Sequence, residues 1–128
     1  MAQEKGPLTD QVYLDALADC RRLTRGGGID AVMIFENLDA LVAPTTLPAW
    51  TNDLVHGGHR SYGASSAAAV SGYPSITVPS GHVSGLPVGL LFFGRANTEG
   101  KLISYAYAFE QATKVRTKPG FLETLPLG

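Results

Sequence analysis

Three short apolar runs, each bounded by proline or glycine, constrain the fold of this chain more than any other feature. The runs cover residues 40–43, 75–78 and 88–93. Continuous apolar runs of this length between such breakers are typical of strands that are buried on both faces. Strands of that kind need helices to cover them. We therefore expect an α/β fold, with a small mixed sheet of about three strands flanked by helices.

Apolar residues recur every three or four positions near the start of the chain, which predicts a helix over residues 10–24 with one buried stripe. The glycines at 26–28 are expected to end this helix. A second, short helix should begin at Asp30, with Ile29 and Ile34 packed across its first turn, and Asn37 should end it in the left-handed conformation. The expected buried stripe of the first helix is Val12, Ala16, Cys20 and Leu23.

Two further helices are expected downstream. One starts at Ser65 or Ser66 and ends at Gly72, and the other covers residues 101–114 after Thr98. Residues 80–87 contain two glycines and are expected to form a loop between the second and third strands.

Composition narrows the classes of function. The chain has 128 residues, so we expect a single unit over residues 1–128. Only 16% of the residues are charged, against about 25% in typical domains, which indicates extra surface that another chain or segment covers. A net charge of −1 argues against nucleic acid or an anionic membrane as partner. The single cysteine, Cys20, excludes an internal disulfide, and the cytoplasm is the expected compartment.

A long polar connection at residues 44–63 follows the first expected strand. A structureless segment of this length in a compact domain is usually functional or disordered. Ligands bind to open α/β sheets beyond the ends of their strands, so four residues here are candidate ligand contacts. They are Trp50, Thr51, Asp53 and His56. The alternative for Trp50 is that its indole anchors its own loop.

Other site chemistry has weaker support in the sequence. Ser65 and Ser66 lack a G-x-S-x-G elbow, and their alternative role is to cap the helix that follows. His56 and His59 are spaced H-x-x-H, but two glycines between them disfavour the helix that would align them on a metal. No glycine-rich phosphate motif is present. We therefore expect no metal and no cofactor.

Five phrases in register resemble the C-terminal part of the amidase signature family. The similarity runs from about residue 13 to residue 122. The phrases are LDALVAPT at residues 38–45, AVSGYPSITVP at 69–79, GLPVGL at 85–90, FFG at 92–94 and AFEQA at 108–112.

The resemblance implies an enzyme that hydrolyses carboxylic amides to an acid and ammonia or an amine. It implies a Ser–cis-Ser–Lys triad, no metal and a large mixed sheet between helices. None of the triad residues maps onto this sequence, so catalytic residues are expected to be absent and the chain alone is expected to be inactive. Ser65 and Ser66 fall where the family has a serine-rich helix start near the pocket, and Asp53 and His56 are candidates to contact the polar end of a substrate.

Three interpretations follow from these observations. The first is the C-terminal part of an amidase, contributing scaffold and pocket wall, with an amide substrate bound only in the full enzyme. The second is a non-catalytic subunit or binding module that pairs with a triad-bearing partner chain. The third, an independent small enzyme using Ser, His and Asp, lacks the required arrangement of groups. Open sheet edges also predict self-association or pairing with the N-terminal amidase portion.

Overall fold

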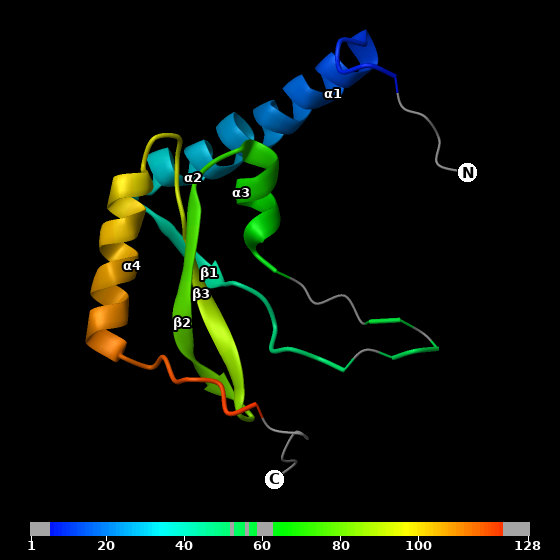
Figure 1. Ribbon diagram of the computed structural model, residues 1–128. Helices are drawn as coiled ribbons and strands as arrows, with labels where there is room; N and C mark the ends of the chain where they lie inside the picture. The colour runs from blue at the N-terminus through cyan, green and yellow to red at the C-terminus, as the bar shows by residue number, and fades with distance from the viewer. Residues whose placement is uncertain (1–5, 52, 56, 59–62, 122–128) are drawn as a thin grey trace.

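The computed structural model describes residues 6–51, 53–55, 57–58 and 63–121. In Figure 1, helix α4 lies alongside a twisted sheet, while α3 lies beside a long helical rod that crosses the top of the molecule. The helices are α1 (Gln11–Arg21), the π-helix η1 (Arg22–Ile29), α2 (Asp30–Phe35), α3 (Ser65–Ser71) and α4 (Glu99–Thr113), and the strands are β1 (Leu41–Pro44), β2 (Ser75–Val83) and β3 (Leu86–Phe93).

The three strands form one sheet in the order β1-β3-β2. Both pairs of neighbouring strands are antiparallel, and Leu90 of the central strand lies opposite Pro44 of β1 and Val78 of β2. The expected α/β class and the three strand positions are confirmed.

The β2–β3 hairpin is longer than the sequence predicts. Residues 80–87 are not the expected loop, because β2 continues through Pro79 to Val83. Pro79 is tolerated because β2 is an edge strand of this sheet and the register shifts between Pro79 and Gly81. The turn itself is Ser84–Gly85, with φ of 50° and 77°, the positive values that a type I′ hairpin turn requires.

The core lies between α4 and the sheet. Leu102 and Ala106 of α4 are buried against Val78 and Phe92, and the rings of Phe92 and Phe109 meet edge to face at 6.1 Å between centroids. Leu102, Ala106 and Phe109 therefore form one apolar stripe of α4 that faces the sheet. Helix α4 covers Glu99–Thr113, close to the predicted residues 101–114, and Thr98 precedes it without a side-chain capping bond.

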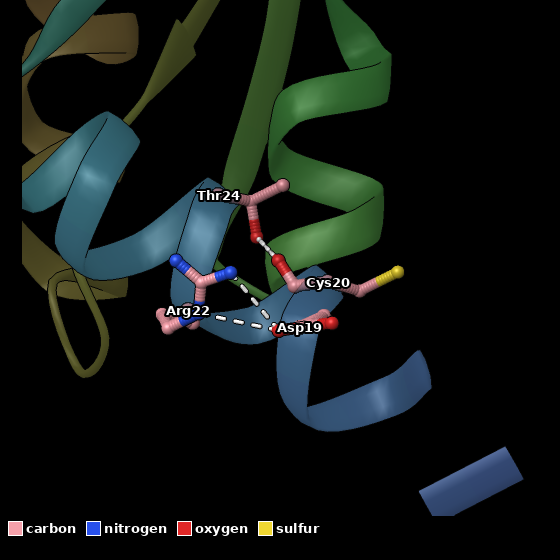
Figure 2. A network of polar contacts seen from close by, with 4 residues as sticks. All are labelled: Asp19, Cys20, Arg22 and Thr24. Atoms are coloured by element: carbon pink, nitrogen blue, oxygen red, sulfur yellow. Dashed lines mark hydrogen bonds and ion pairs between the residues drawn. The ribbon is translucent and has the colours of Figure 1, made fainter. Parts of the chain in front are cut away.

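The prediction that glycines 26–28 end the first helix is wrong. The chain stays helical from Gln11 to Phe35, because the glycines lie in a π-helical segment between α1 and α2. Thr24 Oγ1 donates to the carbonyl of Cys20 at 2.7 Å, at the junction where the helix widens (Figure 2). Side-chain bonds of this kind locally loosen an α-helix.

The stripe predicted on this helix is also not buried. Val12 is 82% exposed, and Leu23 and Cys20 are exposed as well. The physical reason is visible in Figure 1, where α1 projects away from the sheet and packs mainly beside η1 and α3.

Helix α2 ends as predicted at Asn37, whose φ is 51°. The amide of Leu38 donates to the carbonyl of Met33 at 2.8 Å, and the amide of Asn37 donates to the carbonyl of Ile34 at 3.3 Å, which together form a Schellman motif. The packing of Ile29 on Ile34 is not formed, since Ile29 is buried and Ile34 is exposed.

Strand β1 is expected from the sequence to be buried on both faces, and this is wrong for the described chain. Its residues alternate between half-buried and exposed, and Val42 is 58% exposed. One face of β1 is uncovered because the helices lie over the other parts of the sheet.

Candidate functional site

The long connection after β1 is held closed at its base. Thr46 and Gly63 form an antiparallel bridge, and the amide of Ala64 donates to the carbonyl of Thr45 at 3.2 Å. A Cβ added at Gly63 would lie 2.9 Å from that carbonyl oxygen, so a larger residue would push the two segments apart. The connection therefore leaves and returns at one point, directly before α3 (Figure 1).

Trp50 and Thr51 lie on the outgoing half of this connection, and both are exposed. The Trp50 side chain is 47% exposed, so part of its indole is accessible. Their proposed contact with a ligand stays a prediction.

Asp53 lies at a tight turn. Its Oδ1 accepts a hydrogen bond from the amide of Val55 at 2.7 Å, and its carbonyl accepts one from the amide of Gly57 at 2.9 Å. Gly57 has a φ of 78°, which suits glycine at the end of such a turn. Asp53 is exposed, and His56, its predicted companion, lies outside the described residues.

Ser65 and Ser66 form the first turn of α3, and both are exposed. The residue at the cap position is Ala64, and no described side chain caps this helix. The capping role that the sequence offers as an alternative is therefore wrong, and both serines lie directly after the base of the connection.

The sheet carries a groove that the sequence does not predict. The groove has a volume of about 350 Å³. It lies on the face of the sheet away from α4, since side chains alternate along a strand, and Thr77 in the groove is the neighbour of the core residue Val78. Thr45 Oγ1 and Thr77 Oγ1 lie 2.5 Å apart at its floor, beside Gly89. The lining residues are Thr45, Thr46, Leu47, Thr77, Val78, Pro79, Pro87, Val88 and Gly89.

A polar cluster joins segments that are distant in sequence. Asp30 Oδ2 accepts from the Tyr73 hydroxyl at 2.8 Å, and Asp30 Oδ1 accepts from Arg95 Nε at 3.1 Å. Burial raises the pKa of the Tyr73 phenol above its ordinary value, and the hydrogen bond to Asp30 and its negative charge raise this pKa further. The charges of Arg25 and Arg95 act in the opposite direction.

Arg25 completes this cluster from η1. Its guanidinium carbon lies 5.1 Å from the centroid of the Tyr73 ring, and its Nε donates to the carbonyl of Ser71 at 2.7 Å. Ser71 is fully buried, with its hydroxyl bonded to the carbonyl of Ala68 at 2.9 Å. No local sequence pattern predicts these contacts, because Arg25 and Ser71 are 46 residues apart.

Comparison with known proteins decides the family. No family model matches the chain. It is 41% identical over 108 residues to a probable amidase from Arabidopsis thaliana, which covers 84% of this chain and 18% of that protein. It is 37% identical over 110 residues to a glutamyl-tRNA(Gln) amidotransferase subunit of Desulforudis audaxviator, covering 81% of this chain and 21% of that protein.

The solved structures agree. The crystal structure of PAM12A superposes with a TM-score of 0.87 at 51% identity over 92% of this chain and 24% of that one. The native peptide amidase of Stenotrophomonas maltophilia gives a TM-score of 0.81 at 50% identity over 94% of this chain and 24% of that one. A bacterial aryl acylamidase of the amidase signature family gives 0.55 at 25% identity, covering 84% of this chain and 26% of that one. The chain is a segment of an amidase signature protein.

The amidase signature segment corresponds to the C-terminal part of its relatives and spans only about a fifth to a quarter of their length. Within the described part of the chain, no serine hydroxyl is hydrogen-bonded to a histidine or lysine side chain. His82 Nε2 instead lies 3.2 Å from Thr117 Oγ1, near the turn of the β2–β3 hairpin.

Two further properties of the amidase signature segment concern the described residues alone. They contain no group of three or more histidine, cysteine, aspartate or glutamate residues placed to hold a metal ion. Among their helices, none is both long enough and apolar enough to cross a membrane.

Proposed function

We propose that this segment belongs to an enzyme that hydrolyses carboxylic amides, and that it contributes scaffold and one wall of the substrate pocket. The observation that carries the proposal is the match to two peptide amidase structures, at 50–51% identity over more than nine-tenths of the chain. Because the sequence identity is this high over a continuous part of the fold, we expect the segment to have the same role here as in those proteins.

The scaffold role rests on the α4–sheet core, which is independent of the long connection. The wall role rests on exposed side chains of that connection, Trp50, Thr51 and Asp53, and on Ser65 and Ser66 in the first turn of α3, with His56 as a further candidate. Exposed polar residues on loops that a rigid frame positions are where binding residues concentrate.

We propose that the Ser–cis-Ser–Lys triad comes from sequence outside these 128 residues. A lysine that acts as a base must be neutral, which requires a lowered pKa. The hydrogen bond and charge of Asp39 instead raise the pKa of Lys101, which favours its protonated form. This argues against Lys101 as such a base.

A chimera tests the proposal. The S. maltophilia peptide amidase with its matching segment replaced by residues 6–121 of this chain should hydrolyse a C-terminal peptide amide and release ammonia. The isolated 128-residue chain should give no turnover on the same peptide amide. A folded but inactive chimera, or turnover by the isolated chain, would contradict the proposal.

The pocket wall has its own test in this chimera. Trp50→Ala should change the ratio of kcat/KM between peptide amides with large and small C-terminal residues, because a large aromatic surface would leave the wall. The matched control is Tyr107→Ala, an exposed aromatic residue on the outer side of α4. An unchanged ratio in Trp50→Ala argues against contact with the substrate.

A second candidate is a non-catalytic subunit or binding module that pairs with a triad-bearing chain. The observation in its favour is the number of large apolar residues left exposed, among them Val12, Leu23, Phe35 and Val42. Co-purification with a larger chain that carries the triad would support this second role. For either role we propose a cytoplasmic setting, no metal or cofactor, and no nucleic acid or membrane partner, in keeping with a net charge of −1.

A further inference from the structure

Arg25 holds the C-terminal end of α3. The carbonyl of Ser71, in the last residue of α3, has no acceptor role inside the helix and receives the Arg25 Nε–H at 2.7 Å. A positive charge at this end also suits the helix dipole. Arg25 is further fixed over the Tyr73 ring, and Tyr73 is bonded to Asp30. The contact is part-buried, so solvent competes with it less than with a surface pair.

The π-helix positions Arg25 for these contacts. A π-helical segment displaces its side chains relative to those of a regular α-helix, and such segments are often found at functional sites. Glycine is needed here, since a Cβ at Gly28 would lie 2.9 Å from the carbonyl oxygen of Leu23. We therefore expect a regular α-helical turn to point the side chain of residue 25 in another direction.

The opposite end of α3 forms the base of the long connection. The helix has 7 residues and is therefore only about 10 Å long, so its two ends move together. Gly63 and Ala64, just before α3, make the backbone contacts to Thr46 and Thr45 that close the connection. Displacement of the Ser71 end would strain these contacts directly.

We propose that Arg25 is a positioning residue, which clamps α3 through Ser71 and Tyr73 and thereby fixes the Gly63–Ala64 base and the exposed Ser65 and Ser66 against the end of β1. That these serines form a pocket wall rests on the proposed function. Their placement by Arg25 does not, and it is measured without any substrate.

Hydrogen exchange of the full 128-residue chain, followed by mass spectrometry, tests the clamp. In Arg25→Met the amides of residues 63–73 should exchange about tenfold faster, because a charge-assisted bond and a cation–π contact are lost. Exchange over β2, β3 and α4 should stay unchanged. The matched control is Arg22→Met, because Arg22 pairs with Asp19 on the exposed side of the same rod, at 3.0 Å (Figure 2).

Conservative variants separate positioning from bulk stability. Arg25→Lys keeps a charged donor and should restore part of the protection at Ala64, whereas Tyr73→Phe removes only the hydroxyl and should loosen the same amides to a smaller degree. Where Arg25→Met does not fold, these two variants carry the test alone. Unchanged exchange at Ala64, or a uniform loss of protection that includes α4, overturns the proposal.

These outcomes are independent of the proposed function. If the chimera is inactive but Ala64 exchanges faster in Arg25→Met, the clamp is supported and only the amidase role is contradicted. An active chimera with unchanged exchange would remove only the clamp.

Discussion

At Gly89 the central strand passes beside a pair of threonine hydroxyls. A Cβ at this position would lie 2.8 Å from both Thr45 Oγ1 and Thr77 Oγ1. The two hydroxyls are already bonded to each other, and the amide of Thr45 donates to the carbonyl of Gly89 at 2.8 Å. The absence of a side chain at residue 89 therefore lets β1, β3 and β2 meet around this point.

Gly89→Ala should destabilise the fold by about 1–3 kcal/mol, because the methyl group forces the threonines apart. Urea unfolding followed by circular dichroism measures the change. Gly100→Ala is the matched control, since a Cβ there meets nothing within 4 Å and alanine favours the helix. Equal stability of Gly89→Ala and the wild type would show that the hydroxyl pair moves freely.

Because of Tyr73, the stability of the fold should depend on pH in the alkaline range. Burial and Asp30 raise the pKa of its phenol, so the folded state favours the protonated form. Its contribution to stability is complete below the unfolded pKa of about 10 and is lost as pH rises through the folded pKa. The wild type should therefore lose more stability than Tyr73→Phe as the pH is raised above about 10.

Denaturant midpoints of both proteins on either side of that pH measure this difference. The raised pKa of Lys101 acts in the same pH range but is common to both proteins and cancels. Tyr107→Phe, in an exposed position on α4, serves as the control and should follow the wild type. Parallel pH curves for wild type and Tyr73→Phe would contradict the assignment.

At the scale of elements, the π-helix depends on one glycine more than on its neighbours. Gly28→Ala places a Cβ 2.9 Å from the carbonyl of Leu23, whereas Gly26→Ala meets nothing within 4 Å. We expect Gly28→Ala to cost about 1–3 kcal/mol and Gly26→Ala to stabilise by about 0.5–1 kcal/mol. Urea unfolding of the two variants measures both values, and equal effects would mean that the segment tolerates a regular helical turn.

Elements governed by local chemistry are predictable from the sequence. Helix α3 with Gly72, helix α4 and the stop at Asn37 all follow from residues within one or two turns. The π-helix is not, because three glycines normally indicate a stop, whereas the contacts of Arg25 with the distant Ser71 and Tyr73 stabilise the helical alternative. The long hairpin is not predictable either, because Pro79 indicates a strand end unless the strand is known to be an edge.

The candidate site is only partly predictable. The long connection is recognisable from its lack of periodicity, and its exposed residues follow from that. The Thr45–Thr77 hydroxyl pair and the Arg25 clamp join residues that are 32 and 46 positions apart, so no local pattern contains them. Such contacts are set by sheet register and helix placement, which a single sequence does not specify.

At the scale of the whole molecule, large apolar side chains remain on the surface. Phe35 of α2 is 86% exposed, and Val12 of α1 and Val42 of β1 are also mostly exposed. Surfaces of this kind associate in water. The isolated chain should therefore form a dimer or larger assembly, with a mass by light scattering of at least twice 13.5 kDa.

The double variant Val12→Lys/Phe35→Lys should shift this assembly toward the monomer, because two charges enter the apolar surface. The control Val83→Lys, at a residue that is also exposed but lies on the far end of the hairpin, should have less effect. A monodisperse wild-type species of 13.5 kDa would contradict the expectation of self-association.

The bridge between Thr46 and Gly63 has a consequence for how such a protein diversifies. Because backbone pairing fixes both ends of residues 47–62 at one place, insertions or deletions between them change little of the closure entropy and leave the strands where they are. We therefore expect this segment to tolerate changes of length and sequence, and thus of recognition properties, while the sheet and helices keep their arrangement.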